Sequence, residues 1–335
     1  MAALAVTNPT LLDLAKATDP DGGIADIVEI LAEQNEILDD MTWVEGNLTT
    51  GNRTSIRTGL PTPTWRKMYA GVQPDKGTQA QVDDSTGMLE AYAEVDKALA
   101  DLSSNTAAFR KVEERAHLEG LNQEIVDTLF YGNESTEPEA FTGFSPRFND
   151  LSSAGNSDNV IAGGGSQTDN ASIWLVVWSP QTCFGIIPKG STAGLQRSDL
   201  GEVTIEDASG GSNTGRMQAY RTHYRWDAGL TVRDWRYVVR IANIDKSALT
   251  NDASAGADLP DLMFQAMTQI PNLNMGRAAF YMSRNTMSFV RRQATNATSG
   301  STLTIDNAGG KMLTQFQGIP LRRCDALAAD EALVS

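Results

Sequence analysis

The segment "GLPTPTWRKMYAGVQPDKGTQ", Gly59 to Gln79, has the composition of an exposed loop but carries side chains that such a loop has no reason to keep. Three prolines, three glycines and three cations break regular structure and favour turns. The segment also holds apolar and aromatic side chains: Leu60, Trp65, Met68, Tyr69 and Val72. Because the segment is too broken to build its own core, we expect these side chains to be buried against another surface.

The residues on both sides of this segment predict a two-stranded excursion from Arg53 to Asp96. Between Leu89 and Asp96, apolar side chains alternate with Glu, Tyr and Asp, which is the two-residue period of a half-buried strand. The stretch from Thr42 to Leu60 is polar and reads as extended chain. The proline- and glycine-rich segment therefore lies near the tip of a long hairpin.

The strongest helical pattern follows the hairpin, from Ser104 to Tyr131. Ser and Asn residues at its start are good N-caps, and Gly132 is a typical stop. An apolar stripe runs along this helix, and His117 lies beside it, where we expect a partly packed histidine. At 1.5 Å per residue, its roughly 28 residues would span about 40 Å. A second helix, with an apolar face that needs a partner, is predicted for Ile24–Asp40.

The rest of the chain predicts strands and helices in separate runs. Residues 134–170 are rich in Gly, Ser, Asn and Asp, which indicates a loop or linker. Strands are predicted at 173–178, 215–229, 230–245, 278–283, 302–306, 311–316 and 319–324, and short helices at 260–270 and 284–294. Because the helices and strands are segregated and do not alternate as βαβ units, the sequence predicts an α+β fold.

The bulk composition argues against several classes of protein. The formal net charge of −15 and the pI of about 4.6 are opposite to those of most nucleic-acid-binding proteins. Two histidines leave little proton-transfer or metal chemistry near neutral pH. Two cysteines predict no disulfide framework and favour a reducing compartment. The sequence contains no secretory signal pattern and no apolar run of membrane-spanning length, so no membrane partner is expected.

A search for catalytic constellations finds none. The chain has no phosphate-binding loop motif, and its Gly163–Gly165 run lies in the predicted linker. A nucleophilic Cys183 would need His223 beside it, so a small buried thiol is the simpler interpretation. No histidine pair has metal-ligand spacing. We therefore predict no catalytic, cofactor or metal site, and a protein that is not an enzyme.

Two predicted strands interleave arginines with aromatic residues, as a stacking platform for nucleic acid would. The arginines are Arg216, Arg221, Arg225, Arg233, Arg236 and Arg240, and the aromatics are Tyr220, Tyr224, Trp226, Trp235 and Tyr237. The alternative is that the aromatics form a core face while the arginines point outward and pair with carboxylates. The alternation of the strands favours this second interpretation.

The order of these elements resembles the major capsid proteins of tailed double-stranded DNA bacteriophages, which have the Hong Kong 97-type fold. The similarity is greatest to the epsilon15-like podophage group. It covers nearly the whole chain and includes the phrases "GLTVRDWRYVVRIANID", "AAFYMSRNTMSFVRR" and "GKMLTQFQGIPLRRCDAL". The resemblance implies an N-terminal arm, a hairpin called the E-loop, a long spine helix, a peripheral (P) domain and an axial (A) domain.

The resemblance also implies boundaries and interface residues. The arm is expected at 1–45, the E-loop at 46–98, the spine helix and the loop after it at 99–172, the A-domain at 173–258, and the remainder of the A-domain with P-domain strands at 259–335. The E-loop would lie across a neighbouring subunit and bury the apolar side chains that its own chain leaves uncovered. The expected subunit contacts are Arg53, Arg57, Trp65, Lys67, Met68 and Tyr69 in the hairpin, and Arg110, Glu113, Glu114 and Arg115 in the spine helix.

The implied function is a structural protein that self-assembles, as pentamers and hexamers, into the icosahedral shell around a phage genome. The spine helix starts too early to leave room for an N-terminal scaffolding segment, so a separate scaffold protein is implied, with portal and decoration proteins. The acidic charge suits a container that contacts packaged double-stranded DNA weakly and without sequence specificity. The expected location is the virion capsid, assembled in the cytoplasm of the host bacterium.

Two alternatives stay open at the level of sequence. One is an encapsulin-type nanocompartment, a cellular shell around an enzyme cargo, which the cargo of purified particles would reveal. The other is a sheet-based nucleic-acid-binding protein that uses the arginine and aromatic strands. Salt-sensitive binding by the monomer would support it, and the net charge of −15 argues against it.

Overall fold

The computed structural model describes residues 33, 35–102, 105–166, 168–206, 216–251, 253–296, 303–308, 311–328 and 330–335. The chain divides into two compact units. The first unit comprises Met1–Gln34, Met88–Val126 and Thr192–Asp227, and the second comprises Asn35–Gly87, Asp127–Ser191 and Ala228–Ser335. Three elements contain a boundary between units: β3 (Thr78–Asp96), α4 (Thr106–Tyr131) and β8 (Arg216–Val232).

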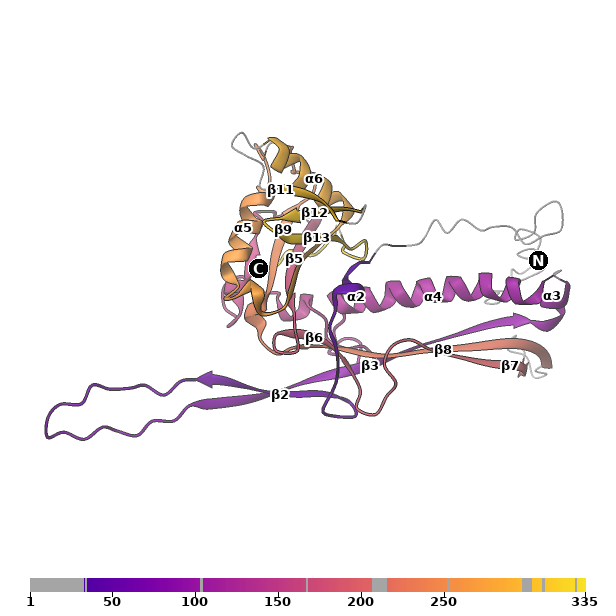
Figure 1. Cartoon of the computed structure of the whole chain (residues 1–335), viewed down its shortest axis with the longest axis horizontal. Coiled ribbons are helices and arrows are strands. Elements are labelled where there is room, and N and C mark those ends of the chain that lie inside the picture. Colours follow the sequence, from indigo (N-terminus) through magenta and orange to yellow (C-terminus); the bar gives the residue numbers. More distant parts are fainter. Residues whose placement is uncertain are drawn as a thin grey trace. The chain divides into compact units, whose positions relative to one another are not determined.

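The second unit is built on a mixed sheet around β5 (Asn170–Trp178) (Figure 1). Strand β5 pairs antiparallel with both β9 (Val238–Asp245) and β10 (Arg277–Met282). The sheet continues from β10 through the strands β13 (Ile319–Arg323), β12 (Lys311–Phe316) and β11 (Leu303–Ala308). Beyond β9, β4 (Val160–Ala162) pairs parallel with β9. At the end of β5, Trp178 pairs with Cys183 of β6 (Cys183–Ile187), and β1 (Trp43–Glu45) pairs parallel with β6.

Every residue of β5 is buried because both of its faces are covered. On one face, Ile173 and Leu175 pack in the same core as Met263 of α5 (Leu259–Gln269) and Val290 of α6 (Arg284–Asn296). On the other face, aromatic rings surround Trp174 at centroid distances of 6.1, 5.5 and 6.0 Å: Phe130, Phe144 and Phe148. A strand buried on both faces reads as a continuous apolar run, and "IWLVVW" is such a run.

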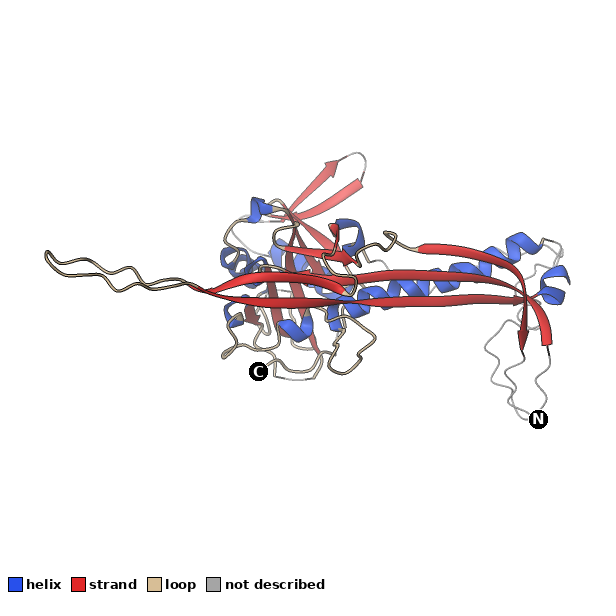
Figure 2. Ribbon diagram, turned by 90° about the horizontal axis from the view of Figure 1, so that it is seen from below, coloured by secondary structure: helices blue, strands red, loops and turns tan. Residues whose placement is uncertain are grey.

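The hairpin is formed by β2 (Gly51–Gly59) and the first part of β3. The two strands pair antiparallel from Gly51 opposite Ser85 to Gly59 opposite Thr78. Residues 60–77 join them without strand structure. This connection, called the hairpin loop below, projects beyond the paired strands in both views (Figures 1 and 2). The predicted hairpin with a broken tip is therefore confirmed.

In the first unit, α4 packs against the strands β3 and β8. Strand β7 (Gln196–Glu206) pairs antiparallel with β8, and α3 (Lys97–Leu102) follows β3. Phe109 of α4 is buried with Val95 and Leu99, and Leu121 is buried with Ala93 and Tyr224. On β3, Ala93 and Val95 are buried while Glu90 and Tyr92 are exposed. The predicted two-residue period of this strand is confirmed.

Most predicted elements occur where the sequence places them. The spine helix is α4, which begins two residues later than predicted, and the terminal strands and both short helices are found at their expected positions. The remaining described elements are α2 (Ile37–Asp40) and the 3-10 turns η1 (Ser145–Arg147), η2 (Ser157–Asn159), η3 (Trp235–Tyr237) and η4 (Leu273–Met275). Of the predicted helix Ile24–Asp40, residues 24–32 and 34 lie outside the described residues.

One predicted strand is wrong in part, and two strands are not predicted. The single strand predicted at 230–245 is divided: residues 230–232 complete β8, η3 interrupts the chain, and β9 begins at Val238. The interruption has a local cause, because the carboxylate of Asp234 accepts a hydrogen bond from the backbone N–H of Arg236 at 3.1 Å. Strands β6 and β7 are not predicted at all. Within the described residues, no helix combines the length and the hydropathy needed to cross a membrane.

Candidate assembly surface

The hairpin loop exposes the apolar side chains that drew attention in the sequence. Their relative exposures are 77% for Leu60, 101% for Trp65, 90% for Met68, 104% for Tyr69 and 51% for Val72. Single exposed apolar residues are common on protein surfaces, but a cluster of this size marks a surface that binds something. Among the residues that the structure describes, none covers these side chains, so the hairpin loop is the candidate surface for binding a partner.

The stem and tip of the hairpin carry cations beside this apolar cluster. Arg53 on β2 binds Asp83 on β3 through two parallel contacts of 2.6 Å, Nε to Oδ1 and a terminal nitrogen to Oδ2. The hydrogen bond from Arg53 lowers the pKa of Asp83. Arg57 on β2 and Lys67 in the loop are exposed. The predicted hairpin residues therefore share one accessible element.

The spine-helix residues of the prediction lie in a different environment. The buried carboxylate of Glu114 accepts hydrogen bonds from Thr222 Oγ1 at 2.7 Å, Tyr224 OH at 3.1 Å and an Arg197 nitrogen at 2.8 Å. Arg110 binds Asp199 at 2.9 Å and lies 3.7 Å from Glu114. The structure thus satisfies Arg110 and Glu114 within the first unit. Their role in a subunit contact stays a prediction.

The pKa of Glu114 reflects two opposing effects. Burial disfavours the charged form and raises the pKa, whereas the hydrogen bonds from Thr222, Arg197 and Tyr224 favour the charged form. The hydrogen bonds prevail, and the pKa of Glu114 lies below its ordinary value. Farther along α4, Glu113 is partly buried and Arg115 is exposed. His117 is also exposed, which corrects the expectation of a partly packed histidine.

The arginines of the aromatic strands pair mainly with carboxylates. Arg221 binds Glu94 at 2.6 Å, Arg225 binds Asp227 at 2.8 Å, and Arg236 binds Asp234 at 2.7 Å. Tyr224 and Tyr237 are buried. These contacts confirm the predicted pairing of arginines with carboxylates, but the core face is found only in part, because Trp235 is exposed and Tyr220 and Trp226 are half-buried.

Arg240 is the exception, because the predicted outward orientation is wrong. Its side chain is 3% exposed and pairs with the equally buried Glu331 at 2.7 Å. The guanidinium also lies 5.1 Å from the ring centroid of Trp174 and donates to the carbonyl oxygen of Phe148 at 2.8 Å. Arg236 lies in the 3-10 turn η3 and Arg240 lies in the strand β9. The two-residue alternation of a strand does not run through η3, so it cannot place Arg240 on the same face as Arg236.

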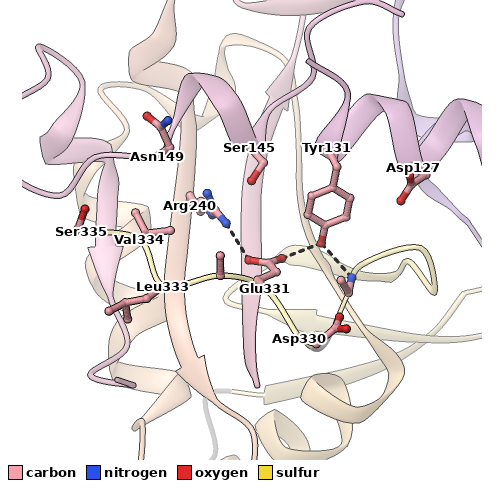
Figure 3. Close-up of a pocket in the computed structure, with 12 residues that line it drawn as sticks. Asp127, Tyr131, Ser145, Asn149, Arg240, Asp330, Glu331, Leu333, Val334 and Ser335 are labelled. Carbon is pink, nitrogen blue, oxygen red and sulfur yellow. Dashed lines mark hydrogen bonds and ion pairs between the residues drawn. The ribbon is translucent and has the colours of Figure 1, made fainter. Parts of the chain in front are cut away.

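Glu331 joins this arginine to α4 at the wall of a hollow of about 550 Å³ (Figure 3). Tyr131 OH donates to Glu331 at 2.7 Å, and Ser172 Oγ also donates to this carboxylate. Burial, followed by the Glu331 carboxylate, raises the pKa of Tyr131. Arg240 and Tyr131 both donate to the Glu331 carboxylate, so these three side chains are hydrogen-bonded to one another through Glu331 at this wall of the hollow.

Cys183 and possible metal ligands are the remaining chemical candidates. Cys183 is fully buried, and burial raises the pKa of its thiol, as expected for a packing residue. Among the residues that the structure describes, no three His, Cys, Asp or Glu side chains come together in a group that could hold a metal ion. The hairpin loop therefore remains the candidate assembly surface, because its large apolar side chains are exposed.

The chain is similar to known phage capsid proteins. The family model described as "Major capsid protein GP7" matches residues 19–335. A chain of the cryo-EM structure of bacteriophage epsilon15 is 39% identical, with 100% of both chains covered and a TM-score of 0.78. A chain of the bacteriophage JBD30 capsid is 11% identical, with 97% of this chain and 96% of that chain covered and a TM-score of 0.48. A search of the curated proteins finds no match.

Proposed function

Because this chain belongs to the major capsid protein GP7 family, we propose that its hairpin loop is the arm by which one copy holds the next in the shell. The chain is a structural protein with the α+β Hong Kong 97-type fold, and it forms the capsid of a tailed bacteriophage. Many copies of the chain build an icosahedral shell. The family match extends over residues 19–335, and nothing favours the nanocompartment alternative.

The single observation that carries the proposal is the exposure of the loop's apolar side chains. Trp65, Met68 and Tyr69 are at least 90% exposed in the isolated chain. Burying one large apolar side chain is worth about 1.5–3 kcal/mol, so covering this cluster gives each contact a useful driving force. A second copy of the chain is the partner, because the shell places copies side by side at every position. Repetition over a closed shell makes modest contacts sufficient.

The finer assignments of the sequence belong to the same proposal. The E-loop is assigned to 46–98, and the pairing of β2 with β3 inside that range supports it. The N-arm is assigned to 1–45, the spine segment to 99–172, the A-domain to 173–258, and the rest to 259–335. Arg53, Arg57 and Lys67 would then form the polar margin of the loop contact, and the spine residues proposed to contact a neighbour remain those of the prediction: Arg110, Glu113, Glu114 and Arg115.

Further partners follow from the same function. A separate scaffold, a portal and decoration proteins would complete the particle, which would assemble in the bacterial cytoplasm. Double-stranded DNA would fill the shell and touch its wall weakly. The net charge of −15 supports weak contact, because an acidic protein on average repels phosphates, and Arg221 and Arg225 already pair with carboxylates. The chain's role is structural, and no enzymatic step is assigned to it.

The test is a triple variant, Trp65→Ser, Met68→Ser and Tyr69→Ser, expressed as the full chain and examined by negative-stain microscopy. We expect folded subunits that form no shells, because the loop has lost its apolar anchors while its own unit has lost no buried contact. Trp65→Phe is the matched control and should still give shells. Shells from the triple variant at the wild-type yield would refute the proposal.

A further inference from the structure

The hairpin loop is ordered by polar bonds although it buries no apolar side chain of its own. Asp75 stands near its base and accepts two backbone hydrogen bonds. Its Oδ2 accepts from the N–H of Thr62 at 2.7 Å, and its Oδ1 accepts from the N–H of Lys76 at 2.8 Å. Thr62 is on the outgoing leg of the loop and Lys76 on the returning leg. One carboxylate therefore ties the two legs together where the strand pairing has ended.

The tip of the loop is also shaped. The N–H of Ala70 donates to the carbonyl oxygen of Lys67 at 3.2 Å, which closes a tight turn. Arg66 Nε donates to the carbonyl oxygen of Ala70 at 3.1 Å. Tyr69 in this turn has a φ of 63°, a left-handed conformation that is uncommon for residues other than glycine. The turn leaves the side chains of Met68 and Tyr69 pointing into solvent.

An ordered loop has an advantage in binding. A segment that is already in its bound conformation pays less conformational entropy when a partner covers it. If only a fraction of the molecules holds that conformation, the apparent affinity falls by the same fraction. The hydrogen bonds of Asp75 should raise this fraction, because they restrict the two legs of the loop. They involve none of the exposed apolar side chains.

We infer that Asp75 is a positioning residue whose carboxylate holds the hairpin loop in its docking shape before a neighbouring copy binds. The inference rests on the proposed function, since it concerns how the same loop meets the next subunit. The backbone hydrogen bonds from Thr62 and Lys76 lower the pKa of Asp75, so the carboxylate is ionised, with both oxygens available as acceptors, at neutral pH.

The residue type explains the arrangement. Two N–H groups need two acceptor oxygens in a short, rigid geometry, and a carboxylate offers both. An asparagine has one carbonyl oxygen and can keep only one of the two bonds, while an alanine can keep neither. Asp75→Asn and Asp75→Ala therefore form a graded pair of variants that leave Trp65, Met68 and Tyr69 in place.

The experiment measures the unassembled full chain first and the shells second. Hydrogen exchange of the Thr62 and Lys76 amides should accelerate in Asp75→Ala, and in Asp75→Asn at one of the two. The protein concentration at which shells begin to form should rise roughly tenfold for Asp75→Ala and several-fold for Asp75→Asn, if the competent fraction falls in proportion. Glu137→Gln removes the same charge at an exposed position outside the hairpin and should leave both readouts unchanged.

Two further readouts separate positioning from a purely structural role. The melting temperature of the unassembled subunit should stay at the wild-type value, because Asp75 contacts only the loop. The rate of shell growth should fall, while the rate at which finished shells dissociate in denaturant should change less than about twofold, since the docked loop is held by its apolar contacts. A purely structural role would move the melting temperature.

The outcomes distinguish this inference from the proposed function. If Asp75→Ala assembles at the wild-type concentration and rate while the triple Ser variant forms no shells, Asp75 has no positioning role and the loop still docks. If the triple Ser variant also assembles normally, the docking proposal itself fails. Unchanged exchange at Thr62 and Lys76 in Asp75→Ala would likewise overturn the inference.

Discussion

Trp65 in the hairpin loop is fully exposed, whereas Trp174 on β5 is fully buried among Phe130, Phe144 and Phe148. Both belong to the second unit, and both are large aromatic side chains that favour burial. The sheet meets this preference within its own chain, and the loop does not. The comparison shows that a subunit can bury the aromatic side chains of its core and still leave large aromatic side chains exposed on its surface.

The same contrast holds for ion pairs. Arg53 and Asp83 of the hairpin are about half exposed, and Arg240 and Glu331 of the body are almost fully buried. Exposed pairs are weak and can be broken and remade, which suits an element that must find a neighbour during assembly. A buried pair is costly to break, since the partner left behind is an unpaired buried charge. The Arg240–Glu331 pair is therefore expected to be harder to break than the Arg53–Asp83 pair.

The largest expected effect compares the two tryptophans directly. Trp174→Ala should destabilise the unassembled subunit by about 3–5 kcal/mol, because it leaves a cavity among packed rings. Trp65→Ala should change that stability by less than about 0.5 kcal/mol, because the side chain has no packing partner within the chain. Urea unfolding of each variant measures both values. A stability loss for Trp65→Ala close to that of Trp174→Ala would break the comparison.

A smaller effect is expected at the buried ion pair. Glu331→Gln removes the charge that compensates Arg240 and should cost about 3 kcal/mol of unfolding free energy. Arg53→Ala, which removes an exposed pair, serves as the reference and should cost much less, because solvent screens that pair. Thermal and urea unfolding of the unassembled chain would measure the difference. Equal costs would mean that burial does not separate the two pairs.

The smallest effect sharpens the comparison through pH. The folded-state pKa of Glu114 lies below its ordinary value of 4.5, so its ionised form contributes stability that is complete above about pH 4.5. As the pH falls from there to the lowered folded-state pKa, the unfolded chain takes up the proton first and this contribution is lost. Glu114→Gln should cost about 1.5 kcal/mol at pH 7.

The control for this prediction is the slope of stability against pH. Between pH 5 and pH 3, the unfolding free energy of Glu114→Gln should fall less steeply than that of the wild type, because the variant has no proton to take up at this position. Asp83→Asn at the exposed hairpin pair should alter the slope much less. Parallel curves for the wild type and Glu114→Gln would contradict the assigned role of this carboxylate.

The elements with a strong local pattern could be predicted from sequence. The apolar run of β5, the Asn105 cap of α4 and the period of β3 each depend on residues that are close along the chain, and each is found in the structure. The exposure of the apolar side chains in the hairpin loop could also be predicted from local composition, because the prolines and glycines prevent this segment from forming a core of its own. Strand β7, with the sequence "QRSDLGEVTIE", lacks a strong apolar period and was missed.

The candidate site was predicted unevenly for the same reason. Trp65, Met68 and Tyr69 stand out from local composition alone, whereas Arg53, Arg57 and Lys67 were named only through the family resemblance, and the structure places all six on the hairpin. Glu114 was chosen as a contact for a neighbouring subunit, but Thr222, Tyr224 and Arg197, which satisfy it within the chain, lie far away in sequence. No spacing rule connects a carboxylate on a helix to a hydroxyl on a strand about a hundred residues later.

By itself, then, the sequence determined the segments with a strong local pattern, such as β5, β3 and α4, and that one broken loop carries apolar groups. Only the tertiary structure decided that Arg240 is buried with Glu331, that Glu114 is satisfied inside the subunit, and that Asp75 ties the loop's legs together. The reason is physical. Periodicity and turn chemistry act between residues close in sequence, whereas the partner of a charge is set by which distant strands and helices the fold brings within hydrogen-bonding distance.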